Sequence, residues 1–346
     1  FCPEYSKRAR LDEIIEYSTQ GYEYTELTSV EELEQTDLTG RRLLFAISLG
    51  ESGINMHWMA MMKYLRLNTH ALDGSVGGII VNGMSEIFTK SIGRDAVFTA
   101  NRAGCSFVGK PLVEGTGTLK NYNIQAKNLH LDNFSAYKEA GRTLVENIMT
   151  YERISHEKPK VLVMHASDSR TSNSIALWEM IADHLEGFDI TEVSLRNGAV
   201  VDCRGCSYEA CRHFGEEGTC FYGGPIAEEA YPAILECDAI VMVCPNYNDA
   251  IGGNLTAFIN RLTALFTIHR FYDKQVYAVI VSGYSGGDIV AEQIISGLNM
   301  NKTFALPARF AIMETANDPR AILDSEGVRD RAARFARNMV ENLQSM

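Results

Sequence analysis

The chain has 346 residues, more than one domain usually contains, so two domains are the first expectation. Hydrophobic residues make up 46% and charged residues 22%, which excludes a disordered, collagen-like or disulfide-scaffold protein. Lys and Arg number 32 against 44 Asp and Glu. The resulting net charge of −12 argues against nonspecific binding to nucleic acid or to an anionic membrane.

The sequence also lacks the usual signals for membrane insertion or export. Its longest apolar stretches fall short of the ~20 residues that span a bilayer. Charged residues such as Arg8, Arg10 and Asp12 interrupt the start of the chain, so no signal peptide is predicted there. We therefore expect a cytoplasmic protein.

Residues 1–154 predict an N-terminal α/β domain without an evident role. An acidic, helix-rich lead-in over residues 1–40 precedes an apolar strand within Arg41–Gly50. Further elements are expected in chain order: a helix over Met56–Leu67, a strand over Val76–Val81, a helix ending at Ala100, a Gly-rich loop over Gly104–Asn121 and a helix over Ser135–Tyr151. The strand–helix repeat suggests a degenerate copy of the second half.

Residues 159–346 show a more regular alternation, after a polar break near Ile154–Lys160. The expected strands are Val161–His165, Ile190–Leu195, Ala239–Cys244, Val276–Val281 and Ala308–Met313. The expected helices are Ser174–Leu185, Ile226–Glu236, Asn254–Phe266, Ala291–Leu298 and Val328–Gln344. Alternating strands and helices predict a doubly wound parallel sheet, which binds ligands at the carboxyl ends of its strands.

The loop after the first of these strands, Ser167–Ser174, is rich in hydroxyl side chains and precedes a helix. Hydroxyls and free backbone N–H groups at a helix N-terminus can bind phosphate, although Ser-rich helix caps are common without any ligand. The loop contains neither Gly-x-Gly-x-x-Gly nor a Walker lysine, so dinucleotide-binding and NTPase motifs are excluded there.

Two further loops follow predicted strands. Pro245-Asn246-Tyr247-Asn248 could present a planar platform to a flat heterocycle, or form an ordinary turn. The loop from Ser282 to Gly287 has three glycines in six residues, which permit close backbone approach to a ligand or a flexible surface turn. Three such loops at the ends of three strands are less expected by chance than any single one.

With these pieces in this order, residues 159–346 resemble the flavodoxin-like NADPH-dependent FMN reductases and the iron–sulfur flavoproteins. Further matching pieces are Cys203-x-x-Cys206, Cys244–Tyr247 and Phe258–Arg261. The resemblance implies a flavodoxin-like, five-stranded parallel sheet that holds FMN. It places the phosphate on Ser167, Ser169, Arg170, Ser172, Asn173 and Ser174, and the isoalloxazine against Pro245, Asn246, Tyr247, Asn248, Gly283, Tyr284, Ser285, Gly286 and Gly287.

Four cysteines are concentrated in eighteen residues: Cys203, Cys206, Cys211 and Cys220. Four thiolates suit a [4Fe–4S] cluster or a tetrahedral zinc ion, and free or redox-active thiols are an equal alternative. The spacing is wider than that of the iron–sulfur flavoproteins it resembles. Cys237 and Cys244 lie in apolar runs and are expected to be buried small hydrophobic residues.

The preferred hypothesis is an FMN-dependent oxidoreductase that passes electrons from NAD(P)H to a quinone or another small aromatic acceptor. The alternative is a non-catalytic electron carrier for a partner protein, with FMN and a [4Fe–4S] cluster. The resemblance also implies a homodimer or homotetramer. Tyr247 and Asn248 are expected nearest the flavin ring, with Tyr284 covering it.

Overall fold

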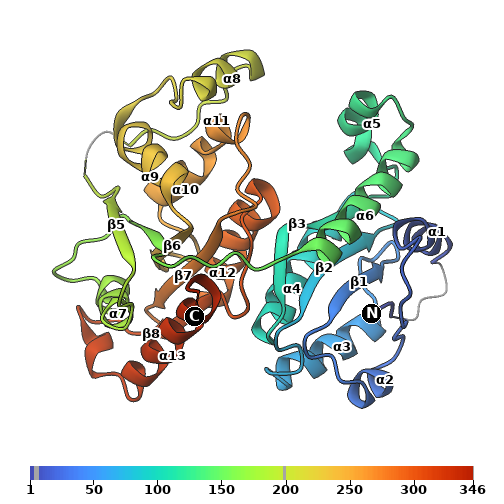
Figure 1. Cartoon of the computed structure of the whole chain (residues 1–346), viewed down its shortest axis with the longest axis horizontal. Coiled ribbons are helices and arrows are strands. Elements are labelled where there is room, and N and C mark those ends of the chain that lie inside the picture. Colours follow the sequence, from blue (N-terminus) through green and yellow to red (C-terminus); the bar gives the residue numbers. More distant parts are fainter. Residues whose placement is uncertain (4–7, 198–199, 346) are drawn as a thin grey trace. The chain divides into compact units, whose positions relative to one another are not determined.

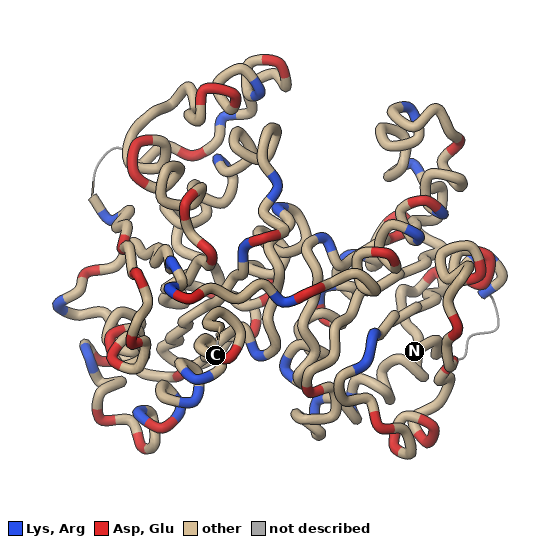
Figure 2. The backbone as a smooth tube through the Cα atoms, viewed as in Figure 1, with Lys and Arg blue, Asp and Glu red and all other residues tan. Residues whose placement is uncertain are grey.

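The computed structural model describes residues 1–3, 8–197 and 200–345. The chain divides into two compact units, Phe1–Glu152 and Arg153–Met346 (Figure 1). Acidic and basic residues alternate along the backbone of both units, so the acidic excess is not confined to one segment (Figure 2). Within the described part of the chain, no helix has the length and apolar character needed to cross a membrane.

The first unit contains a three-stranded parallel sheet in the order β1-β2-β3. Its strands are β1 (Arg42–Ser48), β2 (Val76–Asn82) and β3 (Ser106–Gly115). Its helices are α1 (Ala9–Ser18), α2 (Val30–Gln35), α3 (Met56–Leu67), α4 (Thr89–Arg102), η1 (Lys120–Tyr122), α5 (Asn123–Leu129) and α6 (Asn133–Thr150). Apolar side chains of α1 and α6 pack on one sheet face, and α4 packs against β2 and β3.

Strand β3 lies where the sequence predicted a Gly-rich loop over Gly104–Asn121, so that prediction was wrong. The pairing of β2 with β3 shifts register between Phe107 and Leu112, and Lys110 has a φ of 54°. The intervening residues form a bulge, an arrangement that accommodates Pro and Gly within a strand. The apolar residues on both sides of the bulge, including Phe107 and Val113, are buried.

The carboxyl edge of this first sheet is closed by Arg10 of α1. The Arg10 guanidinium donates to Asn82 Oδ1 at 2.6 Å, to Gly83 O at 2.5 Å and to Gly117 O at 3.2 Å. These acceptors follow or end β2 and β3, which is where a parallel sheet usually binds a ligand. A side chain of the unit itself therefore fills that position.

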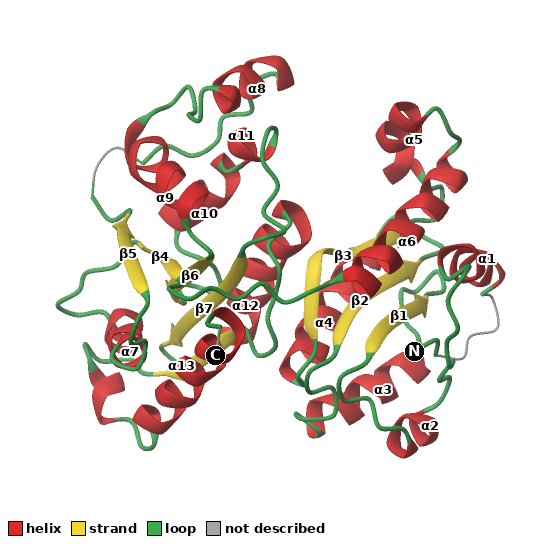
Figure 3. Ribbon diagram, in the orientation of Figure 1, coloured by secondary structure: helices red, strands yellow, loops and turns green. Residues whose placement is uncertain are grey.

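The second unit contains the five-stranded parallel sheet, in the order β5-β4-β6-β7-β8 (Figure 3). This confirms the predicted flavodoxin-like, doubly wound architecture. The strands are β4 (Lys160–His165), β5 (Asp189–Ser194), β6 (Ala239–Pro245), β7 (Gln275–Ser282) and β8 (Ala311–Thr315). The order reverses at β4, because β5 and β6 pair on opposite sides of it. Neighbouring strands β1, β2 and β3 of the first sheet follow one another in chain order, as do neighbouring strands β4, β6 and β7 of the second. This order is the one expected if the first unit is a shortened copy of the second.

Helices cover both faces of the five-stranded sheet. They are α7 (Asn173–Ala182), α8 (Tyr208–Glu216), η2 (Ile226–Ala230), α9 (Tyr231–Glu236), α10 (Gly253–Arg261), α11 (Thr263–Phe266), α12 (Gly287–Ile294), η3 (Ile295–Met300), η4 (Ala321–Asp324) and α13 (Val328–Leu343). The core on one face joins α7 and α13 to alternate residues of the strands, such as Val161, Val241 and Val279. Burial on both faces explains the continuous apolar runs of the inner strands.

Three elements of the second unit differ from the sequence prediction. The cysteine-rich loop contains α8, whose first turn is capped by Ser207 through a bond from Ala210 N. The last strand begins three residues later than predicted, at Ala311, because Pro307 and the left-handed Arg309 precede it. Helix α12 begins earlier, directly after the left-handed Gly286.

Candidate functional site

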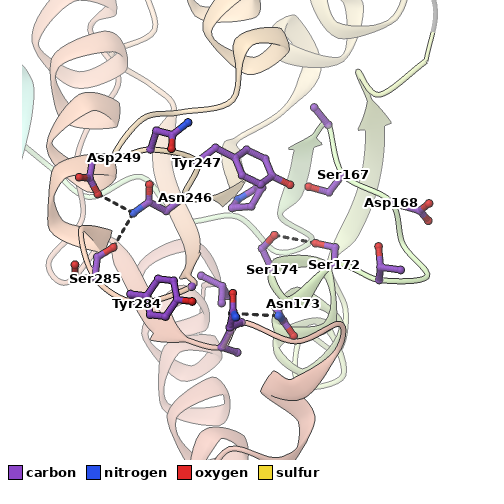
Figure 4. A pocket seen from close by; sticks show the side chains of 18 of the residues that line it. Ser167, Asp168, Ser172, Asn173, Ser174, Asn246, Tyr247, Asp249, Tyr284 and Ser285 are labelled. Carbon is purple, nitrogen blue, oxygen red and sulfur yellow. Dashed lines mark hydrogen bonds between the residues drawn. The ribbon is translucent and has the colours of Figure 1, made fainter.

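A cavity of about 780 Å³ lies at the carboxyl ends of the five strands of the second unit (Figure 4). Each strand is followed by residues that line it. They are Ala166, Ser167, Asp168, Thr171, Ser172, Asn173 and Ser174 after β4; Arg196 after β5; Pro245, Asn246, Tyr247, Asn248 and Asp249 at β6; Val281, Gly283, Tyr284 and Ser285 at β7; and Ala316 and Asn317 after β8. The cavity adjoins β4, the point where the strand order reverses.

The loop after β4 is held as a tight turn by Asp168. The carbonyl oxygen of Asp168 accepts bonds from Thr171 N and Ser172 N, and its Oδ1 accepts from Arg170 N at 2.9 Å. Ser172 caps α7 by accepting from Ile175 N. The N–H groups at the start of α7 have no intrahelical acceptor and are available to an anion.

Among the residues of this loop, Ser167 points most directly to a bound ligand. The residue is 8% exposed, and its Oγ is buried without a hydrogen-bond partner among the described residues. Ser172 Oγ and Ser174 Oγ are 3.0 Å apart on the same side of the cavity. A buried hydroxyl without a partner is unfavourable. A ligand oxygen at this end of the cavity would remove that penalty.

Asn173 ties the loop to the segment after β8. Its Nδ2 donates to Ala316 O at 3.2 Å and Asp318 O at 2.9 Å, and its Oδ1 accepts from Ile322 N at 3.1 Å. Arg320 adds a bond to Ser169 O at 3.0 Å. We call residues 316–322 the clasp. The Asn173 side chain is committed to the clasp, so this residue positions the loop.

Asn246 occupies the opposite end of the cavity. Its Nδ2 donates to Ser285 O at 2.8 Å and Ser282 Oγ at 3.2 Å, joining the loops after β6 and β7. Its Oδ1 is buried and has no partner within the described part of the chain. Tyr247 and Tyr284 are exposed, the latter to 84%. This end therefore combines one orphaned buried acceptor with two solvent-accessible rings.

Gly286 is required by the close approach of these two loops. Its φ is 83°, and a Cβ at this position would overlap Asp249 Oδ1. Asn248 and Asp249 also adopt left-handed conformations, with φ values of 53° and 56°. Three residues in a region that L side chains rarely adopt indicate a turn with a specific shape.

Most of the predicted flavin-binding residues line the cavity. They are Ser167, Ser172, Asn173, Ser174, Pro245, Asn246, Tyr247, Asn248, Gly283, Tyr284 and Ser285. Ser169, Arg170, Gly286 and Gly287 do not line it, and Ser169 and Arg170 are exposed. Among the polar lining residues, sequence reasoning missed Asp168, Thr171, Arg196, Asp249 and Asn317. Asp168 and Thr171 belong to the loop that the sequence had singled out, whereas Arg196 and Asn317 follow β5 and β8, whose loops were not singled out.

The charges of the cavity include an ion pair beside the loop after β4. Arg196 Nη2 lies 2.8 Å from Asp168 Oδ2. The hydrogen bond from Arg170 N, followed by the charge of Arg196, holds the pKa of the Asp168 carboxyl below its usual range. Asp168 is therefore ionised at neutral pH, and Arg196 neutralises it.

The four clustered cysteines lie outside this cavity. Cys203 and Cys206 are exposed, and Cys211 and Cys220 are partly exposed. Partial burial, followed by the neighbouring thiols of Cys220, Cys203 and Cys206, raises the pKa of Cys211. Among the described residues, no three His, Cys, Asp or Glu side chains are arranged to hold a metal ion. The metal site expected at these four cysteines therefore stays a prediction.

Arg261 lies beneath the cysteine segment and is 2% exposed. Its guanidinium donates to Val201 O at 3.3 Å and Gly223 O at 2.7 Å, on the two sides of Cys203–Cys220. Its Nε has no partner in the described ranges. The segment is therefore held at both ends by one buried cation. Cys237 and Cys244, by contrast, are buried as predicted, and burial raises the pKa of each thiol to about 12.

The chain was compared with curated sequences and with solved structures. No curated protein sequence matches the chain significantly. Similar solved structures include an NAD(P)H:quinone oxidoreductase from Methanothermobacter marburgensis, with 17% identity, coverage of 53% of this chain and 97% of that chain, and a TM-score of 0.40. An azoreductase from Bacillus anthracis has 16% identity, coverage of 53% and 99%, and a TM-score of 0.36.

The family comparison concerns sequence rather than structure. Residues 159–318 match the model of the NADPH-dependent FMN reductases. The matched stretch lies within the second unit and contains β4 to β8, together with every residue that lines the cavity. The similarity to the NADPH-dependent FMN reductase family is thus confined to residues 159–318, slightly less than half of the chain.

Proposed function

We propose that the second unit binds FMN in the cavity and uses NAD(P)H to reduce a quinone or another small aromatic acceptor. The observation that carries this proposal is a pair of buried, unpartnered oxygen atoms, Ser167 Oγ and Asn246 Oδ1. One is a hydroxyl that can donate and the other an amide oxygen that can only accept. FMN has a phosphate at one end and a ring N–H at the other, so it can satisfy both.

The chain's own groups have distinct roles in this proposal. Ser167, Ser172, Ser174 and the first N–H groups of α7 would hold the phosphate. Asn246 would accept from the ring and keep the loops after β6 and β7 together. FMN when bound supplies the capacity to accept a hydride and pass on electrons. The exposed positions of Tyr247 and Tyr284 leave the ring end open to a nicotinamide and then to an acceptor.

The test begins with binding. Apoprotein is titrated with FMN while flavin fluorescence is followed, and saturation at one FMN per chain is expected. The loaded protein is then mixed anaerobically with NADPH or NADH and benzoquinone as the probe acceptor. Oxidation of the nicotinamide should require both protein and FMN, with each component alone as the control. Protein that fails to take up FMN would contradict the proposal.

A second candidate function is electron transfer to a partner protein through FMN and a [4Fe–4S] cluster at Cys203, Cys206, Cys211 and Cys220. The observation that favours it is Arg261, a buried cation whose guanidinium donates to backbone carbonyl groups on both sides of the cysteine segment. An anionic cluster would balance that charge. Because no three of the described thiols are arranged to hold a metal ion, cluster assembly would require movement of the segment.

An absorption spectrum of anaerobically purified protein separates the two candidates, with iron and acid-labile sulfide assayed on the same sample. The second candidate predicts about four irons per chain. It also predicts that Cys203→Ser loses the iron, whereas the buried Cys244→Ser keeps it. Flavin bands without iron in the wild-type protein would leave only the reductase.

A further inference from the structure

The loop after β4 is rich in hydroxyls, but its only cation is not among the residues that line the cavity. Arg170 is exposed and does not line the cavity. Among the described lining residues, three carry charge, namely Asp168, Asp249 and Arg196, so Arg196 is the single cation. A dianionic phosphate is bound most strongly where a guanidinium can pair with it.

Arg196 is placed beside the loop by the sheet. Strands β4 and β5 are parallel neighbours, with His165 paired to Ser194, so the loops that follow them adjoin. Leu195 is fully buried, its N–H donates to His165 O at 2.8 Å, and its carbonyl accepts from Asn254 Nδ2 at 2.6 Å. The backbone next to Arg196 is therefore fixed on both sides.

The ion pair with Asp168 directs the Arg196 side chain toward the loop. The two side chains are 47% and 31% exposed, so a ligand in the cavity can reach them. Without Arg196, the Asp168 carboxylate would repel an incoming phosphate. Arg196 thus removes a repulsive charge and offers its remaining N–H groups to the anion.

We propose that Arg196 recognises the flavin phosphate and makes the cavity selective for FMN over riboflavin, while Asp168 holds its guanidinium in place. This inference rests on the proposed function, because it assigns a residue of the same site. It differs from the sequence expectation, in which Arg170 was the one cation among the six residues placed at the phosphate. Arg196 follows β5, and no other residue of that strand or the loop after it is among the residues that line the cavity.

The test compares the dissociation constants of FMN and riboflavin by fluorescence titration. Arg196→Gln should weaken FMN binding about tenfold and leave riboflavin binding unchanged, because riboflavin lacks the phosphate. Arg196→Lys should restore part of the preference for FMN over riboflavin, because lysine returns the positive charge but lacks the planar guanidinium group that can form two parallel hydrogen bonds. Added salt should weaken FMN binding to the wild-type protein more than to Arg196→Gln. Arg334→Gln, an exposed arginine of α13 outside the cavity, is the charge-matched control.

Several outcomes would overturn the inference. Equal weakening of both flavins by Arg196→Gln would mean that the residue only supports the fold. Selective loss of FMN in Arg170→Gln, with Arg196→Gln unchanged, would assign the phosphate to Arg170. A wild-type protein that binds neither flavin would instead refute the proposed function, so the two failures are distinguishable.

Discussion

Ser167 and Asn246 are small polar residues whose orphaned oxygen atoms mark the two ends of one cavity. Folding normally pairs buried polar atoms, because an unpaired one loses its bonds to water without replacement. Both atoms belong to strand-end loops, where a ligand rather than the chain can supply the partner. The proposed binding of FMN depends on these two atoms.

Replacing Ser167 by alanine should weaken FMN binding while leaving the unliganded protein as stable as before. A hydrogen bond to a charged group contributes about 1.5–3 kcal/mol, which corresponds to at least a tenfold rise in the FMN dissociation constant. The unliganded protein loses no hydrogen bond, because Ser167 Oγ has none to a described residue. Fluorescence titration and thermal unfolding measure the two effects. Ser169→Ala is the comparison, and an equal loss from that exposed residue would contradict the placement of the phosphate.

The eight cysteines should differ in reactivity according to how deeply each thiol is buried. Burial raises the pKa of Cys237 and Cys244 to about 12, so at pH 8 both remain protonated and unreactive. Cys203 and Cys206 are exposed and should react first with iodoacetamide. Mass spectrometry of alkylated peptides, before and after denaturation, checks the order. Early labelling of Cys244 in native protein would show that the inner strand β6 opens readily.

At the scale of elements, the clasp supports the loop after β4 from a distant part of the chain. Asn173 bonds to three backbone groups of residues 316–322, and Arg320 bonds to Ser169 O. Arg320 also pairs with Glu179 of α7 at 2.9 Å. The start of α7 is thus fixed by a segment that follows the last strand of the sheet.

Asn173→Ala should therefore destabilise the second unit. The variant leaves Ile322 N and two carbonyl groups without their partner, a loss of about 1–3 kcal/mol for each group that stays buried. Urea unfolding should show a lower midpoint with an unchanged slope. Asn173→Asp keeps the acceptor for Ile322 N and should therefore lose less stability than Asn173→Ala. Equal stability of all three proteins would mean that water replaces the clasp bonds.

The sequence allowed the five strands of the second unit and three of the five strand-end loops to be predicted, because their signals are local. Runs of buried apolar residues mark the inner strands, and Ser, Asn and Gly clusters mark the loops after β4, β6 and β7. Arg196 and Asn317 have no such local signal. Their place in the cavity follows from the pairing of β5 and β8 with their neighbours, which is a tertiary property.

At the scale of the whole molecule, the two units have separate cores and separate sheets. In the second unit a cavity lies at the carboxyl ends of the strands, whereas Arg10 fills the equivalent position in the first. One chain should therefore carry one FMN.

Thermal unfolding should separate the two units. We expect two transitions in calorimetry, of which FMN raises only one, because a ligand stabilises the unit that binds it. At a hundredfold excess over the dissociation constant the stabilisation is about 2.7 kcal/mol. Riboflavin at the same concentration is the control and should raise that transition less. A shift of both transitions by FMN would show that the units unfold together or that both bind flavin.

The clasp also affects how the protein folds while it is being synthesised. Asn173 and its partners at Ala316 and Ile322 are separated by 143 and 149 residues, so the ribosome releases the loop long before its supports. The nascent chain can complete sheet pairing from β4 to β7 while the phosphate end of the cavity remains unsupported. If the cavity binds FMN as proposed, uptake is confined to nearly finished chains, and an unfinished chain would not withdraw flavin from the cell's supply.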